Sequence, residues 1–85
     1  MDEQPRIVDG LEITVVADGS VVYDPRRDRV HYLNQTAALV LELCTGENDA
    51  AAMARALDVA YDLGEPPAAE TLACLEQLAA EGLIG

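Results

Sequence analysis

The amino-acid sequence predicts an α+β domain in which a three-stranded antiparallel sheet is followed by three helices. The first third of the chain has short runs of Ile, Val, Thr and Tyr separated by turn-forming residues, a pattern typical of strands. After Asn34 the apolar residues recur at intervals of three and four, the spacing of an amphipathic helix. Gly46, Gly64 and Gly82 divide this part into three segments, because glycine readily takes the left-handed conformation that ends a helix.

The first two strands are expected at residues 11–17 and 21–23, joined by a turn at Asp18 and Gly19. An Asp-Gly pair is favoured in two-residue type I′ turns, in which both central residues need positive φ angles. The two strands therefore form an antiparallel hairpin.

The predicted register places Val15 opposite Val22 and Val16 opposite Val21. Consecutive side chains of a strand point to opposite faces, so this register puts apolar residues on both faces of the hairpin. The pattern leaves open which face packs against the helices.

The third strand is expected at residues 29–33, after a polar turn at residues 24–28. Consecutive strands tend to lie side by side, so this strand should lie at an edge of the sheet. An edge strand has unpaired backbone N–H and C=O groups, and these groups can pair with another chain.

The first helix is expected at residues 35–45, with Asn34 as its N-cap and Gly46 just after its end. The second helix should begin after Asp49, another N-cap residue, and end by Gly64. Both starts are predicted because a short polar side chain can accept hydrogen bonds from the free N–H groups of the first helical turn.

The third helix should begin near Pro66 and Pro67, which are tolerated at a helix start, and end at Gly82. Its expected apolar face consists of Ala68, Leu72, Leu75 and Ala79, with Thr71, Cys74 and Leu78 along a flank. Leu83 and Ile84 follow the helix and are expected to fold back on the core.

A sheet followed by three short helices is also the composition of a winged helix-turn-helix, a fold that often binds DNA. The third helix would be the recognition helix, yet residues 65–81 contain four glutamates and no Lys or Arg. The whole chain has 16 acidic and five basic residues, for a formal charge of −11. Such a surface repels the phosphates of nucleic acids and anionic lipids, so we expect neither a nucleic acid nor a membrane as partner.

Residues 1–10 are polar and contain Pro5 and Gly10, which predicts a flexible lead-in before a domain formed by residues 11–85. The acidic N-terminus has no apolar stretch typical of a signal peptide. No uninterrupted apolar run is longer than that of residues 37–41, which is too short to span a membrane. We therefore expect a cytoplasmic protein.

The sequence contains no recognisable catalytic or metal-binding motif. His31, the only histidine, lies in a predicted strand with no Ser or Cys at a catalytic spacing. Cys44 and Cys74 form no C-x-x-C pair, so buried free thiols are their expected state, with a disulfide or a metal role as alternatives. A Gly-rich phosphate loop is also missing from the sequence. We expect a binding protein that is not an enzyme and that uses no metal or cofactor.

Several short motifs follow one another in the order of a known family. They are Val22-Tyr23-Asp24-Pro25, Val30-His31-Tyr32-Leu33-Asn34, Thr36-Ala37 and Leu43-Cys44-Thr45-Gly46, followed by leucines at helical spacing and Gly82-Leu83-Ile84. Over residues 13–84 the chain resembles the PqqD family. This family is the stand-alone form of the recognition element for ribosomally synthesised and post-translationally modified peptides (RiPPs).

The resemblance implies that the chain binds the leader region of a precursor peptide and presents it to a modifying enzyme, often a radical SAM maturase. In this family the leader adds as a strand beside the third strand, in the cleft between that strand and the third helix. The matching positions are Arg29, Val30, His31, Tyr32 and Leu33 on the strand, and Thr71, Cys74, Leu75 and Leu78 on the helix. Core packing is the alternative role of these residues, above all of Leu33 and Leu75. Cys74 stands where family members often have an aromatic residue, which implies a shallower pocket.

Charged residues predict that this cleft has a basic and an acidic side. The basic side would consist of Arg26, Arg27 and Arg29, and the acidic side of Glu70 and Glu76. A peptide with opposite charges at its two ends would then bind in one orientation.

A second function from a different class stays open at the level of the sequence. The chain could be an acidic interaction or regulatory subunit that uses the same scaffold to hold a protein partner. The oligomeric state is open between monomer and homodimer, because an unpaired strand edge can also pair with a second copy.

Overall fold

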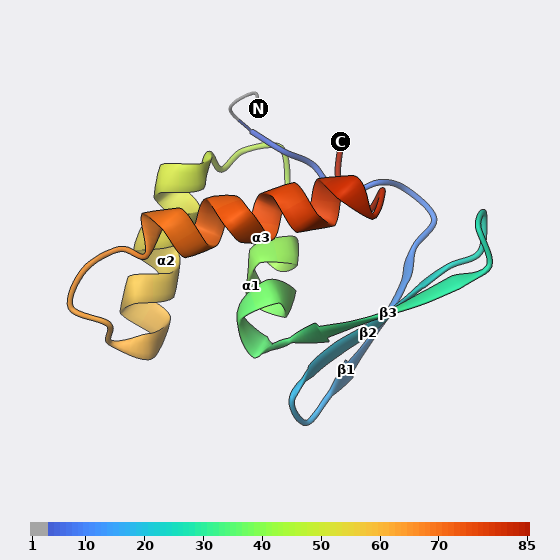
Figure 1. Ribbon diagram of the computed structural model, residues 1–85, viewed down its shortest axis with the longest axis horizontal. Helices are drawn as coiled ribbons and strands as arrows, with labels where there is room; N and C mark the ends of the chain where they lie inside the picture. Colours follow the sequence, from blue (N-terminus) through green and yellow to red (C-terminus); the bar gives the residue numbers. More distant parts are fainter. Residues whose placement is uncertain (1–3) are drawn as a thin grey trace.

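The computed structural model describes residues 4–85 and contains a three-stranded antiparallel sheet followed by three helices (Figure 1). The strands are β1 (Glu12–Val16), β2 (Gly19–Asp24) and β3 (Arg29–Asn34), and the helices are α1 (Gln35–Leu43), α2 (Ala50–Tyr61) and α3 (Ala68–Ala80). The predicted α+β fold class is confirmed. The comparison with a winged helix-turn-helix stays a prediction.

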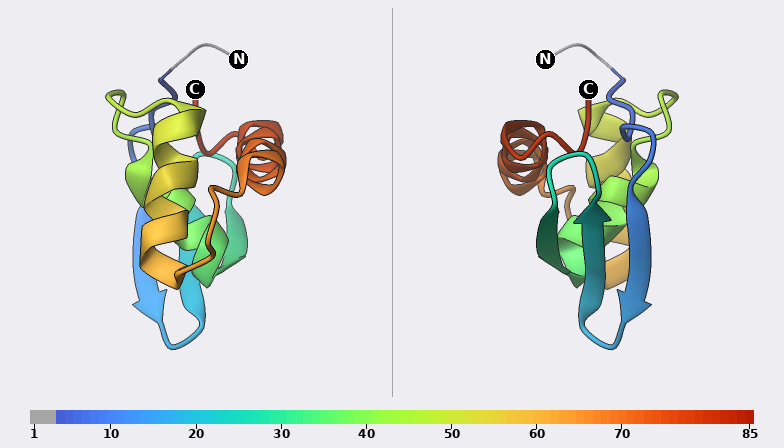
Figure 2. Two further views of the ribbon diagram at one scale, coloured as in Figure 1. Left: turned by 90° about the vertical axis from the view of Figure 1, so that its left-hand side faces the viewer. Right: turned by 90° about the vertical axis from the view of Figure 1, so that its right-hand side faces the viewer.

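The sheet forms one layer, and the helices lie on one side of it (Figure 2). Strand order in the sheet is β1-β2-β3, so β1 and β3 are its two edges. Both views in Figure 2 show α3 on the side of the molecule where β3 lies, and β1 on the opposite side. The edge strand β3 and the helix α3 are thus brought to the same side.

The register of the first hairpin differs from the predicted one by two positions. Val15 pairs with Ser20 and not with Val22, and Val16 pairs with Gly19 and not with Val21. A shift of two residues keeps each side chain on its face of the sheet, because the side-chain period of a strand is two. The register prediction was wrong, but the assignment of residues to shared faces is unaffected.

Gly19 has a different place in the hairpin from the predicted one. The predicted turn used Gly19 as its second residue, but the structure places it in β2 with a φ angle of 151°, and residues 17–18 form the turn. A Cβ atom at this position would overlap the Leu33 carbonyl oxygen on β3. Glycine is needed here because the third strand approaches the backbone closely.

The burial of side chains along β2 shows which face of the sheet packs against the helices. Ser20, Val22 and Asp24 alternate along this strand and are all buried, Val22 completely. His31 of β3 pairs with Val22, so it lies on the same face. Tyr32 lies on the opposite face and is 81% exposed. The structure thereby answers the question that the alternation of the sequence left open.

Two helices begin at the predicted N-caps. Asn34 Oδ1 accepts a hydrogen bond from the Ala37 N–H at 2.8 Å, and Asp49 Oδ1 accepts one from the Ala52 N–H at 2.8 Å. Each side chain thus satisfies one of the free N–H groups in the first turn of its helix. α3 begins after Pro67 and has no side-chain cap.

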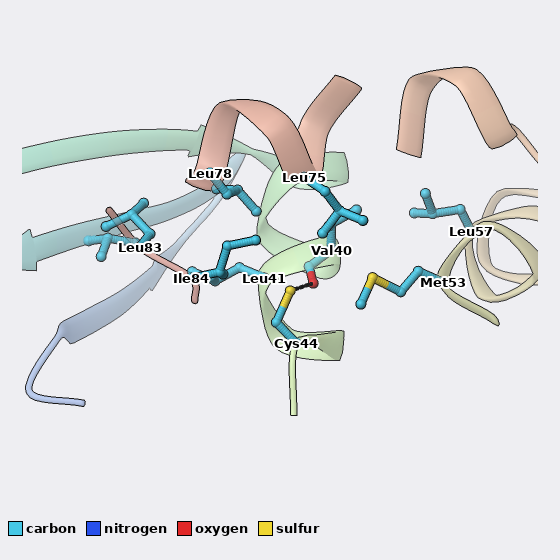
Figure 3. Packing of buried hydrophobic residues seen from close by; sticks show 10 residues of the cluster. Val40, Leu41, Cys44, Met53, Leu57, Leu75, Leu78, Leu83 and Ile84 are labelled. Carbon is cyan, nitrogen blue, oxygen red and sulfur yellow. Dashed lines mark hydrogen bonds between the residues drawn. The ribbon is translucent and has the colours of Figure 1, made fainter. Parts of the chain in front are cut away.

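α1 lies at the centre of the hydrophobic core (Figure 3). The labelled side chains come from all three helices and from the chain end; they are Val40, Leu41, Cys44, Met53, Leu57, Leu75, Leu78, Leu83 and Ile84. Leu83 and Ile84 are buried, as predicted for a segment that folds back on the core. No aromatic residue belongs to this cluster, so its stability depends on the packing of many aliphatic side chains.

The buried stripe of α3 consists of Thr71, Leu75 and Leu78, each 1% exposed. The predicted face was wrong except for Leu75, because Leu72 is 48% exposed and the two alanines of that face are also exposed. Alanine and leucine occupy positions all around this helix, so the choice of the inward face depends on packing against the other elements.

Part of the predicted N-terminal lead-in is hydrogen-bonded to the rest of the chain. The Ile7 N–H donates to the Cys44 carbonyl at 2.9 Å, and Arg6 and Gly85 exchange two backbone hydrogen bonds of 3.1 and 2.8 Å. Residues 1–3 lie outside the described residues. The division of the chain at residue 11 stays a prediction.

Candidate binding cleft

β3 has a free edge, as the sequence predicts. In an antiparallel hairpin with a two-residue turn, the pair next to the turn is hydrogen-bonded, and bonded and non-bonded pairs alternate from there. Val16 and Gly19 form this first pair, so the odd-numbered residues of β2 bond to β1 and the even-numbered ones bond to β3. It follows from the register that the backbone N–H and C=O groups of Val30 and Tyr32 point to the free edge.

A surface cleft of about 810 Å³ lies between the first half of β3 and the C-terminal end of α3. It is lined by Arg27, Arg29, Val30, His31, Ala80 and Glu81. Val30 both lines this cleft and points its backbone groups to the free edge. A chain that paired with β3 would therefore run along the cleft.

His31 connects β3 with the end of α3. Its Nδ1 atom lies 3.6 Å from Glu81 Oε1, and its side chain is 10% exposed. The other ring nitrogen, Nε2, is buried and has no hydrogen-bond partner among the described residues. The cleft lining thus includes a carboxylate beside His31.

The Arg27 guanidinium also contacts the end of α3. It packs over Gly82, where a Cβ atom would lie 2.6 Å from Nη1 and where φ is 75°. A cation near the C-terminal end of a helix is stabilised by the partial negative charge of the last carbonyl groups. Arg27 thus joins the turn before β3 to the helix that forms the other wall of the cleft.

Two carboxylates at the connection between β2 and β3, Asp24 at the end of β2 and Asp28 in the turn, already have partners. Asp24 accepts hydrogen bonds from the backbone N–H, Nε and Nη2 of Arg26 at 3.0, 3.1 and 3.2 Å, and these bonds hold the pKa of Asp24 below its ordinary value. The Tyr23 hydroxyl donates to Asp28 at 3.0 Å, which raises the pKa of Tyr23. Arg26 is therefore engaged within the turn.

The predicted contact residues on β3 divide between the two sheet faces. Arg29, His31 and Leu33 alternate on the face toward the helices, while Val30 and Tyr32 lie on the other face and are 50% and 81% exposed. Arg29, Val30 and His31 line the cleft.

The predicted contact residues on α3 are mostly in the core. Thr71, Leu75 and Leu78 are each 1% exposed, and Cys74 is half-buried. The structure therefore brings three of the five predicted strand residues to the cleft, but it buries three of the four predicted helix residues in the core. A direct role of these three in binding stays a prediction.

The charges of the cleft differ in part from the expected arrangement. Arg27 and Arg29 line the cleft, but the acidic residue among its lining residues is Glu81, and neither Glu70 nor Glu76 is among them. Ala80 and Glu81 were not among the predicted site residues. The sequence signal for them is weak: Gly82 marks the end of the helix, but the face that its last turn presents to β3 depends on tertiary packing.

A second, smaller groove lies beside β1, at the other edge of the sheet. Its volume is about 330 Å³, and its lining includes Val15, Leu39 and Tyr61, with Glu42 as its one carboxylate. No arginine lines this groove. The two grooves thus differ in charge, because two arginines line the cleft beside β3 and none of the described residues that line the groove beside β1 is an arginine.

The described residues offer no metal site and no membrane-spanning helix. Within residues 4–85, no three His, Cys, Asp or Glu side chains come together as metal ligands would, and no helix has the length and hydropathy needed to cross a membrane. Cys44 and Cys74 are free thiols. Burial raises the pKa of the Cys44 thiol to about 11, with a smaller contribution from Cys74.

Comparison with protein families gave one match. The family model described as "Coenzyme PQQ synthesis protein D (PqqD)" matches residues 19–84, which include β2, β3 and all three helices. No curated protein and no solved structure matches the chain.

Proposed function

Because the chain belongs to the PqqD family, we propose that it binds the leader region of a ribosomally synthesised precursor peptide and presents it to a modifying enzyme. Family membership supports an accessory, precursor-peptide-binding role in the synthesis of PQQ or a related product. In this proposal the chain performs no chemistry itself, and its enzyme partner is a maturase of the radical SAM type.

The observation that carries the proposal is the free edge of β3 beside the cleft. The outward-pointing backbone groups of Val30 and Tyr32 can pair with the main chain of an extended peptide. Such strand addition is an established mode of peptide recognition, in which main-chain hydrogen bonds contribute affinity and side-chain pockets contribute specificity.

The β3 edge suits this role better than the β1 edge. The cleft beside β3 is the larger of the two and has charged side chains on the strand and on the helix. Charged groups at the rim of a binding site fix the register and orientation of a partner. A peptide on β1 would meet a smaller groove with fewer charged groups.

The buried residues of α3 have an indirect role in this proposal. Leu75 and Leu78 anchor the helix in the core, and this packing holds Ala80 and Glu81 opposite the strand. The position of the cleft wall thus depends on residues that the peptide need not touch.

An NMR titration tests the proposal. The probes are synthetic peptides that cover the N-terminal part of each short open reading frame next to the gene, added to the ¹⁵N-labelled full chain. We expect amide shifts at Val30, His31 and Tyr32 and along the last turn of α3, with the residues of α2 and the turn at residues 17–18 unchanged. The free peptide should be disordered and become extended on binding, and this ordering limits its affinity.

The same titration separates this function from the alternative one. Shifts that gather on α2, or on the groove beside β1, would contradict strand addition at β3. Such shifts would favour an interaction subunit that holds a folded protein partner.

A further inference from the structure

The side chains of β3 that face the helices change in character along the strand. Arg29, His31 and Leu33 occupy this face in order, and Leu33 packs against the hydrophobic core. Side chains of neighbouring strands that lie opposite each other on one face are in contact. A peptide that adds beside β3 would therefore place every second side chain next to one of these three residues.

The arginines at the start of β3 have no carboxylate partner in the part of the chain that the structure describes. Within residues 4–85 the contacts of 4.0 Å or less between a basic side chain and a carboxylate are Arg26 with Asp24 and His31 with Glu81, and neither includes Arg27 or Arg29. Asp24 lies opposite Arg29 in the register, but its carboxylate is hydrogen-bonded to Arg26. Two positive charges at this end of the cleft are thus available to an external carboxylate.

The middle and the far end of β3 favour other side chains. The Glu81 carboxylate lies 3.6 Å from His31 Nδ1. A second carboxylate next to His31 would therefore be repelled by the negative charge of Glu81. Leu33 is half-buried, and together with the half-buried Cys74 it packs on the core cluster. An apolar side chain next to Leu33 would extend this cluster and be removed from water.

We propose, on the basis of strand addition to β3, that the cleft selects peptides that combine one acidic and one apolar side chain four residues apart. The Asp or Glu lies next to Arg29 and within reach of Arg27, and the apolar side chain lies next to Leu33. The residue midway between them faces His31 and Glu81 and is neutral or basic. The spacing follows from the separation of residues 29 and 33 on one face of a strand.

A selection experiment tests this pattern without knowledge of the natural peptide. The probe is an mRNA-displayed library of random unstructured peptides, selected on the immobilised full chain. We expect enrichment of Asp or Glu four positions from Leu, Ile or Val, in one polarity along the peptide. The charge reversal Arg29→Glu should replace the acidic preference by Lys or Arg, whereas the matched variant Arg55→Glu, on the distant helix α2, should leave it unchanged.

A pair of peptides from the selection measures the contact directly. Replacing the selected Glu by Gln should weaken binding to the wild-type chain about fivefold, which corresponds to about 1 kcal/mol, the upper end for an exposed ion pair. The same peptide change should have a clearly smaller effect on binding to Arg29→Gln, because only Arg27 then remains within reach of the Glu. This milder variant also serves if Arg29→Glu does not fold.

The outcomes separate this inference from the proposed function. If selected peptides shift the amides of Val30 and Tyr32 but show no acidic preference, the acidic–apolar pattern is refuted and strand addition stands. If no selected peptide shifts these amides, or none is enriched, both ideas are refuted.

Discussion

A proline at Tyr32 is the sharpest test of strand addition at β3. The Tyr32 N–H points to the free edge, and its side chain is 81% exposed. Tyr32→Pro would remove one donor to the peptide without removing a bond between β2 and β3. The peptide carbonyl group that accepts a hydrogen bond from the Tyr32 N–H would then be left without a donor inside the interface.

The size of the effect follows from two contributions. A hydrogen bond contributes about 1 kcal/mol net, and leaving a buried partner unsatisfied costs at least about 1 kcal/mol more. The loss of about 2 kcal/mol corresponds to roughly 30-fold weaker binding at 25 °C. Isothermal titration calorimetry with a peptide that binds the wild-type chain measures this change.

Two control variants make the result specific. Val15→Pro removes an outward-pointing N–H at the other edge of the sheet, from a side chain of similar exposure (78%), and should bind like the wild type. Tyr32→Ala keeps the backbone donor and reports the contribution of the side chain alone. Equal losses in Val15→Pro and Tyr32→Pro, or wild-type affinity in Tyr32→Pro, would refute the reasoning, provided that circular dichroism shows both variants folded.

Two further predictions concern the core and the thiols. Leu75→Ala should lower the free energy of unfolding by about 2–5 kcal/mol because it opens a cavity in the core. Leu72→Ala, on the exposed side of the same helix, should lower it much less. Urea denaturation compares the two variants, and equal losses would contradict the assigned helix face. At pH 9 Cys44 should react with iodoacetamide more slowly than Cys74. Burial raises the pKa of both thiols, that of Cys44 to about 11, and Cys44 is also the less accessible one, at 1% exposure. Equal rates in peptide mass spectrometry would contradict this difference in burial. The folded-state pKa of Cys44 lies above the value of about 8.5 for an unfolded thiol. The contribution of this thiol to the free energy of unfolding is therefore fully present below about pH 8.5 and is lost as the pH rises through about 11.

Features that depend on near neighbours in the chain were predicted correctly from the sequence. Asn34 and Asp49 cap their helices through bonds to residues three positions ahead, so the local sequence contains both partners of each bond. The edge position of β3 follows from the short turns between consecutive strands. The sequence alone therefore determined the element order, the helix starts and the free edge on which the proposed function rests.

Features that depend on distant residues were decided by the tertiary structure. Gly19 lies in β2 and not in the turn, and there the backbone of Leu33, fourteen residues later in the chain, passes too close for a Cβ atom. The inward face of α3 is Thr71, Leu75 and Leu78 because a helix with alanine and leucine on every side has no unique apolar stripe. The inward face of α3 also fixes the position of Glu81 at the end of the helix, beside His31. A local pattern specifies which bonds a segment can make within itself, but only the packed chain decides which side chains meet across the cleft.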